Sequence, residues 1–446
     1  MEDKKFMKDW KALYNSKLMT ADEAVKLIKS GDKVVFQHDV GEPEALIKAM
    51  VANAANYKDV EISHMFSLGP GEYCKPEYKD NFHPNIWFVS GQTRQAVNEW
   101  GDYTTCFFHE LPELMRQGRV QVDVVLISVS KPDKHGWVSL GVSGDYTVQA
   151  LRSAKTVIAQ VNEHIPFAYG DVAFPLMDYA DAVVECDEPL PALPASKIGD
   201  VEAEIGKYCA SLVQDGATLQ LGIGSIPDAV CAQLKSKKHL GLHSEMLGDG
   251  AMHLFNEGVI DGSEKAFDKG LMVANFVMGS QELYDFCDRN LAVRIMPVDY
   301  VNSPAVIMNC SKMVCINAAL GIDLYGQVAA DALGGHKQFS GVGGQVDFIR
   351  GAAMAKDGQG VAIIAMPSMT VKKDGTKISK ITAQLAAGQP ITDSRNDTEY
   401  VITEYGIADL WGKTNADRAR ALIDIAHPDF RPELKDQMEE MFHQKY

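Results

Sequence analysis

Glu245 has the clearest potential for chemistry of any residue in this sequence. It lies in the stretch Leu240–Gly250, after a short apolar run and before a Gly-Asp-Gly turn. A carboxylate at the end of a buried strand is costly unless it is paired or used. We expect two glycine-rich loops, Gly222–Pro227 and Gly341–Gln345, to converge on it. A carboxylate nucleophile beside exposed backbone N–H groups is a device for acyl transfer.

The second glycine loop is the more specific of the two. Its three glycines within four positions, Gly341-Val-Gly-Gly344, are typical of a nest of N–H donors that binds an oxyanion or a thioester carbonyl. In the first loop, Pro227 at a helix start leaves free N–H groups directed at the loop. An ordinary turn remains the alternative interpretation of both loops.

The first loop also leaves a different class of protein open. A dinucleotide-binding fold places G-x-G after a strand, with an acidic residue about twenty residues further on. Glu245 lies at about that distance from Gly222, but Pro227 replaces the third glycine of the fingerprint. The pattern alone therefore does not exclude a dinucleotide-dependent oxidoreductase.

The basic segment Lys372–Lys377, followed by Lys380, has two interpretations. It suits the phosphates of a large anionic cofactor, but a solvated hairpin tip is the simpler structure for it. Arg395, Arg418 and Arg420 lie in a polar C-terminal region and are predicted to be structural. The histidines are scattered, and we assign His243 no catalytic role because it would face away from Ser244 on a strand.

Length, composition and charge limit the classes of protein to which this chain can belong. With 446 residues, 46% hydrophobic and 23% charged, the chain is typical of a globular protein of two domains. No apolar run suits a membrane helix, and Met1–Phe6 lacks the apolar core of a secretory signal, so we expect a cytoplasmic location. A net charge of −17 disfavours nucleic acid and anionic membranes as partners, while local lysines still permit an anionic small molecule.

The eight cysteines give no sign of a metal site. None forms a C-x-x-C pair, and no histidine cluster has zinc spacing. Most lie in apolar segments such as Met313–Ile316, which predicts buried, reduced thiols.

Helical patterns alternate with short apolar runs along the whole chain, which predicts an α/β fold with largely parallel sheets. The predicted buried strands are Val34–Phe36, Val122–Val129, Thr156–Val161, Leu219–Leu221, Met313–Ile316 and Val361–Ala365.

The chain divides into two similar halves. The proline-rich segment Asp187–Pro194 predicts a boundary between domains at 1–190 and 200–446. In each half a glycine, Gly31 or Gly216, is predicted to end a helix before a strand, and a proline then opens the next helix. The match of Val60–Met65 with Leu240–Glu245 singles out the glutamate, because the first half has no carboxylate there.

Four segments together resemble the acetyl-CoA hydrolase/transferase family, a branch of the class I CoA-transferases. They are Leu221–Val230, His243–Met246, Phe339–Phe348 and Thr403–Asp409, in the family's order, and the resemblance covers nearly the whole chain. It implies two similar CoA-transferase-type α/β domains with the active site in the cleft between them. It also implies that Glu245 is the nucleophile and becomes a glutamyl-CoA thioester.

The resemblance also implies the substrates and the surrounding site. The implied CoA contacts are Gln220, Leu221, Gly222, Ile223, Gly224, Leu320 and Gly343, with the oxyanion loop supported by Gly341, Val342, Gly344 and Gln345. The implied reaction moves CoA from butyryl-CoA to acetate by a ping-pong mechanism. Transfer to 4-hydroxybutyrate, or acyl-CoA hydrolysis on the same scaffold, are the alternatives. CoA would be a substrate, with no metal and no permanently bound cofactor, and we expect a homo-oligomer.

Overall fold

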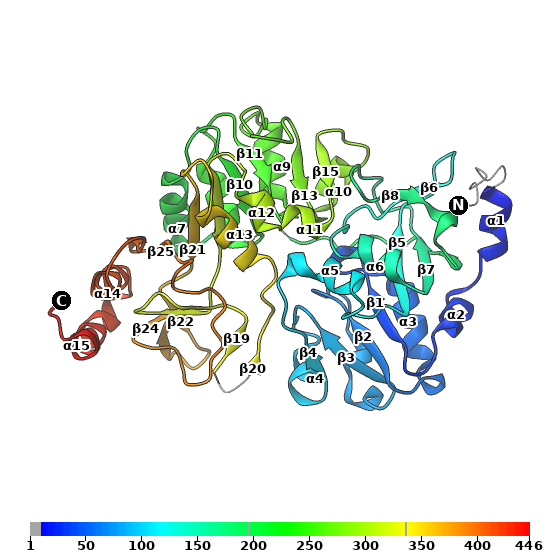
Figure 1. Cartoon of the computed structure of the whole chain (residues 1–446), viewed down its shortest axis with the longest axis horizontal. Helices are drawn as coiled ribbons and strands as arrows, with labels where there is room; N and C mark the ends of the chain where they lie inside the picture. The colour runs from blue at the N-terminus through cyan, green and yellow to red at the C-terminus, as the bar shows by residue number, and fades with distance from the viewer. Residues whose placement is uncertain (1–9, 195, 335–336) are drawn as a thin grey trace. The chain divides into compact units, whose positions relative to one another are not determined.

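The chain forms two compact α/β units, shown in the computed structural model of Figure 1. The structure describes residues 10–194, 196–334 and 337–446, so the segment Met1–Phe6 discussed above lies outside the described residues. Unit 1 contains the described residues up to Thr104, then Glu110–Ala192 and Tyr284–Pro297. Unit 2 contains Thr105–His109, Leu193–Leu283 and Val298–Tyr446. The chain therefore passes between the units several times.

Unit 1 is built on a parallel sheet with the strand order β4-β3-β2-β1-β5-β7-β9. Its strands are β1 (Lys33–Phe36), β2 (Val60–Ser63), β3 (Phe82–Ile86), β4 (Asp102–Tyr103), β5 (Val124–Val129), β7 (Thr156–Val161) and β9 (Ala182–Glu185). Every residue of β5 is buried, as expected for a strand covered on both faces of a parallel sheet. A small antiparallel pair, β6 (Trp137–Ser139) and β8 (Ala173–Pro175), lies outside this sheet.

Within unit 2, the sheet has the strand order β13-β11-β10-β16-β21-β25-β26. Its strands are β10 (Thr218–Leu221), β11 (Gly241–His243), β13 (Met272–Ala274), β16 (Met313–Asn317), β21 (Val361–Ala365), β25 (Tyr400–Thr403) and β26 (Gly406–Asp409). All pairs are parallel except β25 with β26. The carboxyl ends of β11, β10, β16, β21 and β25 therefore lie along one edge of the sheet.

Six neighbouring strands follow the same order in both sheets. The order β3-β2-β1-β5-β7-β9 of unit 1 corresponds in sequence to β13-β11-β10-β16-β21-β25 of unit 2. This confirms the prediction of two similar α/β domains with largely parallel sheets. The pair β1–β2 corresponds to β10–β11, so the residues after β2 and after β11 occupy equivalent places.

Helices connect these strands and bury their apolar sides. The helices of unit 1 are α1 (Trp10–Lys17), α2 (Ala21–Ala24), α3 (Glu44–Ala52), α4 (Arg94–Glu99), α5 (Leu111–Arg116) and α6 (Thr147–Ser153). Those of unit 2 are α7 (Asp200–Ser211), α8 (Ser225–Gln233), α9 (Asp249–Asn256), α11 (Val298–Val301), α12 (Pro304–Ile307), α13 (Gln345–Ala353), α14 (Asn415–Asp424) and α15 (Arg431–Phe442). The chain passes from unit 2 to unit 1 within α10 (Gln281–Cys287), shortly before the short strand β15 (Val293–Ile295).

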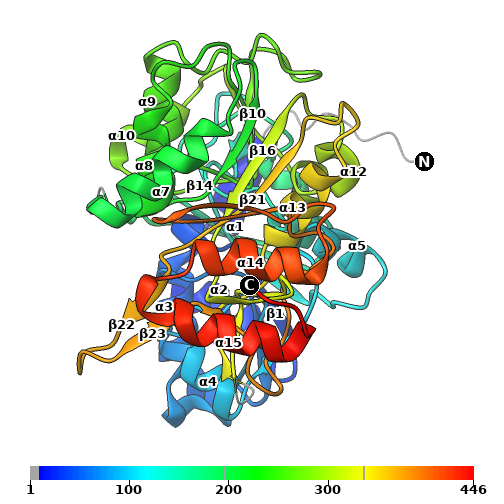
Figure 2. The same ribbon diagram turned by 90° about the vertical axis from the view of Figure 1, so that its left-hand side faces the viewer.

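The helices α14 and α15 pack side by side at the C-terminal end of unit 2, as Figure 2 shows. Thr414 caps α14 because its hydroxyl accepts a hydrogen bond from the backbone N–H of Asp417 at 3.2 Å. Arg418 of α14 is a structural residue, as predicted, since its guanidinium donates to carbonyl oxygens of Tyr325 and Leu410.

The predicted helix ends at Gly31 and Gly216 are wrong. The helical segment before Gly31 consists of α2 and a 3-10 turn that ends at Leu27, and α7 ends at Ser211. Both glycines have positive φ, at 82° and 74°, and lie in the turns that lead into the next strands. A glycine that allows a left-handed turn before a strand has the same sequence signature as a glycine that ends a helix.

The remaining strands form small two- and three-stranded sheets in unit 2. They are β12 (Met246–Leu247) with β14 (Phe276–Val277), β17 (Gly321–Asp323) with β18 (Val328–Ala329) and β24 (Ile381–Thr382), β19 (Ala332–Leu333) with β20 (Lys337–Gln338), and β22 (Met369–Val371) with β23 (Lys377–Ser379). Across the residues that the structure describes, no helix is long and apolar enough to cross a membrane.

Candidate active site

Glu245 lies at the carboxyl end of β11, one residue beyond the buried Ser244. The hydroxyl of Ser244 donates to the carbonyl of Leu221 at 3.0 Å and accepts from its N–H at 3.2 Å, which joins the ends of β11 and β10. On the other side, the N–H groups of Asn275 and Phe276 donate to the carbonyl of Glu245 at 3.0 and 3.2 Å. The backbone of Glu245 is therefore fixed on both sides.

The Glu245 carboxylate meets the second glycine loop. A Cβ added at Gly344 would overlap Glu245 Oε2 and Asn302 Nδ2, so a side chain at this position would displace the contact. Gly344 is the N-cap residue of α13, whose first N–H groups form the positive end of the helix dipole. In the same loop Gly343 has a φ of 55°, a left-handed conformation that favours glycine. The predicted convergence of Glu245 with this loop therefore takes place within unit 2.

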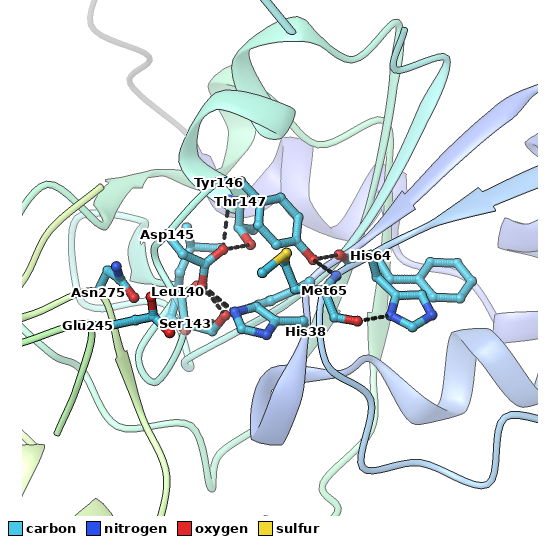
Figure 3. A network of polar contacts seen from close by, with 12 residues as sticks. His38, His64, Met65, Leu140, Ser143, Asp145, Tyr146, Thr147, Glu245 and Asn275 are labelled. Atoms are coloured by element: carbon cyan, nitrogen blue, oxygen red, sulfur yellow. Dashed lines mark hydrogen bonds and ion pairs between the residues drawn. The ribbon is translucent and has the colours of Figure 1, made fainter. Parts of the chain in front are cut away.

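Asn302 orients the Glu245 carboxylate. Its side-chain amide donates to Glu245 Oε2 at 2.6 Å, and its amide oxygen accepts from Asn275 Nδ2 at 2.7 Å. Figure 3 shows Glu245 and Asn275 near one another. Asn302 is fully buried. A buried amide held at both ends has one orientation, so it presents its N–H to the carboxylate.

A second carboxyl group lies behind this amide. Asp347 of α13 is buried and hydrogen-bonded to the Asn302 side chain. It also accepts from His109 Nδ1 at 2.7 Å and from the His109 N–H at 3.2 Å. Burial raises the pKa of Asp347, and the bonds from His109 oppose that rise.

Asn275, Asn302 and Asp347 were not among the predicted site residues. Asp347 lies in the segment Phe339–Phe348, which resembles the family, but the resemblance assigns no role to this residue. The two asparagines come from segments that carry no pattern of chemistry, and only the tertiary fold brings them to Glu245. His243, by contrast, faces Val301, whose carbonyl it contacts at 2.8 Å, and burial lowers its pKa to about 4.

The first glycine loop follows β10, the strand beside β11. Gly224 has a φ of 106° and is the N-cap residue of α8. Gly222 needs no special conformation, since an added Cβ would meet nothing closer than Pro227 at 3.9 Å. Ile223 is 38% exposed and lies over Gly248 in the turn after Glu245. This loop and Glu245 therefore share one edge of the sheet.

The other predicted contact residues are engaged within the chain. Gln220 is buried, and its Oε1 accepts from the Ile316 N–H at 3.2 Å and from Asn317 Nδ2 at 3.1 Å. Leu221 is buried at the end of β10, and the N–H of Leu320 donates to the Ala329 carbonyl at 2.9 Å. Their contacts with CoA stay a prediction.

The remaining part of the second loop leads to another buried acid. Gly341 is buried and Val342 is half-buried. Gln345 donates from its side chain to Asp393 Oδ2 at 2.5 Å. Burial raises the pKa of Asp393 to about 7, and no described residue bonds to its second oxygen, Oδ1. Gln345 is therefore bound to a structural acid in this conformation.

Unit 1 carries a different polar network at the equivalent place. His64 follows β2. Its Nδ1 donates to the carbonyl of Met65 and its Nε2 accepts from the hydroxyl of Tyr73, both at 2.6 Å, and burial lowers its pKa to about 4. Asp145 binds His38 at 2.9 Å and Ser143 at 2.5 Å, as Figure 3 shows. Both histidines are buried and hydrogen-bonded inside unit 1, which agrees with the structural role predicted for them.

No metal site accompanies these groups among the described residues, where no cluster of three histidine, cysteine or acidic side chains is suited to a metal ion. The eight cysteines are free thiols, six of them buried.

Comparison with known proteins identifies the class to which this fold and site belong. The sequence matches the acetyl-CoA hydrolase/transferase N-terminal domain over residues 1–194 and the acetyl-CoA hydrolase/transferase C-terminal domain over residues 279–438. The chain belongs to the acetyl-CoA hydrolase/transferase family.

Relatives of this chain include proteins named as CoA-transferases. The chain is 51% identical to the 4-hydroxybutyrate coenzyme A transferase of Clostridium kluyveri, over 97% of this chain and 100% of that protein. It is 34% identical to the butyryl-CoA:acetate CoA-transferase of Anaerostipes caccae, over 95% and 96%. The structure of RipA from Yersinia pestis has a TM-score of 0.90 and 34% identity, and the match covers 97% of this chain and 99% of RipA.

Proposed function

We propose that this protein transfers CoA between short-chain acyl groups through a glutamyl-CoA thioester on Glu245. The observation that carries the proposal is the position of the Glu245 carboxylate against Gly344, at the N-terminus of α13, with Asn302 donating to it at 2.6 Å. A carboxylate held by donors beside a glycine loop has the parts that acyl transfer requires: a nucleophile and preorganised N–H groups.

The acyl partners in this proposal are acetate and a four-carbon acid. The sequence motifs favour movement of CoA from butyryl-CoA to acetate. The relative at 51% identity is named for 4-hydroxybutyrate, whereas the relative named for butyryl-CoA and acetate is 34% identical. This difference favours 4-hydroxybutyrate as the first acid to test, with butyrate as the second.

The proposed reaction keeps an activated acyl bond, either a thioester or an anhydride, at every step. A Glu245 oxygen attacks the thioester carbonyl of the acyl-CoA, the C–S bond breaks, and a mixed anhydride and CoA thiolate form. The thiolate then attacks the Glu245 carbonyl, which gives glutamyl-CoA and releases the free carboxylate. Attack by the second acid reverses these steps and regenerates the Glu245 carboxylate. All species stay ionised, so no net proton, ATP or redox partner is needed.

The protein must overcome the weak nucleophilicity of a carboxylate toward a thioester. Binding energy from the distant nucleotide end of CoA can hold the reacting atoms together. Each N–H donor preorganised for the oxyanion contributes about 3 kcal/mol in comparable sites. Water must be excluded, because it would hydrolyse the anhydride. Water access also separates this proposal from an acyl-CoA hydrolase on the same scaffold.

Intact mass after mixing the protein with butyryl-CoA or 4-hydroxybutyryl-CoA, without an acceptor acid, tests the proposal. The parent should gain the mass of CoA less one water, and Glu245→Gln should gain nothing. Glu257→Gln is the matched control, because Glu257 is an exposed residue at the C-cap of α9, paired with Lys235 at 2.7 Å, and this variant should still form the adduct.

Three results would contradict the proposal. An adduct on Glu245→Gln would exclude Glu245 as the nucleophile. Free CoA accumulating without an adduct would indicate the hydrolase. Strictly sequential kinetics with two substrates would exclude the ping-pong route.

A further inference from the structure

Lys380 is a partly buried cation that lacks an adequate partner inside the protein. Its Nζ has one hydrogen bond, to the carbonyl of Ala319 at 3.3 Å, and no described residue forms an ion pair with it. Burial lowers the pKa of Lys380. An ammonium group carries three donors, and removing it from water without an anion is unfavourable. The position therefore suits an anion supplied by a ligand.

One acid of unit 2 acts on Lys380 through its charge but does not fill this role. Glu404 raises the pKa of Lys380 through its charge, but its carboxylate is held by Ser368, with the Ser368 N–H donating at 2.8 Å and the hydroxyl at 2.5 Å. Glu404 is thus turned to the end of β21 and does not pair with the lysine.

Lys380 lies at the same edge of the unit 2 sheet as Glu245. Its N–H donates to the carbonyl of Ser368 after β21, and its carbonyl accepts from Ile322 of β17. Its ammonium reaches Ala319, which follows β16. The strand order β11-β10-β16-β21 puts two to three strand spacings between it and Glu245, roughly 10 to 14 Å. An extended pantetheine arm, which joins the thiol of CoA to its pyrophosphate, is of this length scale.

A basic hairpin extends from the same position. The strands β22 and β23 pair antiparallel between Ser368 and Lys380, as predicted for a hairpin, and carry Lys372 and Lys373 at the exposed tip. Neither lysine has a side-chain bond to another described residue, whereas Lys377 is paired with Asp429 at 2.6 Å. Two unpaired cations on a chain with a net charge of −17 form a local positive patch that begins at Lys380.

We propose that Lys380 binds the pyrophosphate of the CoA ester and that Lys372 and Lys373 bind its ribose 3′-phosphate. The assignment rests on the proposed function, because it takes an acyl-CoA with its thioester at Glu245 as the ligand. Ammonium–phosphate contacts are charge-assisted hydrogen bonds, so each is expected to contribute about tenfold to affinity.

Paired substrates separate phosphate binding from a structural role. KM is measured with butyryl-CoA and with butyryl-pantetheine, which has the same reacting end and no phosphate. Lys380→Gln should raise KM for butyryl-CoA about tenfold and leave KM for butyryl-pantetheine unchanged. Lys356→Gln, which removes an exposed lysine before the amino end of β21, is the control and should change neither. Equal rises for both substrates, or no rise for butyryl-CoA, would overturn the assignment.

The hairpin tip gives a second test that does not depend on a partly buried position. Lys372→Gln with Lys373→Gln should weaken CoA about tenfold or more in calorimetry and should weaken 3′-dephospho-CoA much less. Equal weakening of both ligands, or none, would exclude the tip from the site.

Calorimetry also separates the two proposals. It needs no turnover, so the phosphate site is tested even if the parent forms no glutamyl-CoA. A parent that forms the adduct, with unchanged CoA affinity in both Lys380→Gln and the double variant of Lys372 and Lys373, would leave the transfer mechanism intact and exclude only the phosphate site.

Discussion

Gly344 sets how closely α13 approaches the Glu245 carboxylate. Because even a methyl group at this position would overlap both Glu245 Oε2 and Asn302 Nδ2, the contact depends on a hydrogen atom in place of a side chain. The carboxylate thereby lies at the N-terminus of a helix, where a negative charge is stabilised.

Gly344→Ala is expected to displace Glu245 and to slow formation of the CoA adduct about 100-fold, the typical effect of a misplacement of about 1 Å. The rate is measured by intact mass over time. Gly91→Ala is the control, because Gly91 is exposed, with open space where a Cβ would lie. An unchanged rate in Gly344→Ala would mean that the carboxylate does not react from the position seen here.

Asn302 joins Glu245 to the buried groups behind it. Asn302→Ala removes the donor at 2.6 Å and leaves Asn275 and Asp347 short of a partner. We expect kcat/KM to fall about tenfold and the free energy of unfolding to fall by about 1 to 3 kcal/mol. Steady-state kinetics and thermal melting measure the two effects.

The matched control for this asparagine is Asn309→Ala. Asn309 donates from an exposed side chain to Ala305 at 2.6 Å and should leave both quantities nearly unchanged. A fall in stability without any change in kcat/KM at Asn302 would limit that residue to a structural role.

At the scale of elements, the two glycines of the first loop have different reasons to be glycine. Gly224 has φ 106° and ψ −177°, a region that other residues rarely adopt. Gly224→Ala should therefore lower the free energy of unfolding by about 1 to 3 kcal/mol. Gly222→Ala should leave stability within about 0.5 kcal/mol, because its backbone is ordinary and its Cβ would meet only Pro227 at 3.9 Å. Chemical denaturation of both variants checks this, and equal losses would contradict the distinction.

The strands were predictable from sequence, and the supports of Glu245 were not. Runs such as Val124–Val129 are buried on both sides of a parallel sheet, so they stay continuously apolar and are recognisable in isolation. Glu245 stood out because it follows such a run between glycine loops. Asn275, Asn302 and His109 come from separate segments and show no spacing that local sequence can reveal. The helix ends predicted at Gly31 and Gly216 are wrong because glycine with a positive φ occurs both in turns before strands and at helix ends.

At the scale of the whole molecule, buried acids make stability depend on pH. Burial raises the pKa of Glu42 to about 8 and that of Asp393 to about 7. A carboxyl group whose pKa is higher in the folded state binds more protons folded than unfolded. Its contribution therefore destabilises the fold progressively as pH rises from the unfolded pKa near 4 to the folded pKa, and is constant above it.

Asp393→Asn should remove one such contribution. Between pH 4 and about 7 the melting temperature of the parent should fall relative to that of the variant, and above that range the difference should be constant. At pH 8 the variant should be more stable by roughly 2 to 4 kcal/mol, and it keeps an acceptor for Gln345. Melting curves from pH 4 to 8 measure the difference, and a difference that does not vary with pH would show that Asp393 is ionised throughout.

The several passages of the chain between the units bear on how the protein is made. The last segment of unit 1 is residues 284–297. Unit 2 includes His109, which is hydrogen-bonded to its buried Asp347 but belongs to a segment that is translated before the other residues of unit 2. During synthesis neither unit is complete until most of the polypeptide has left the ribosome. A gene cut at residue 192 would encode one fragment without the end of unit 1 and another without His109. Each of the two units, alike in strand order, therefore depends on a segment encoded within the stretch of the gene that specifies the other.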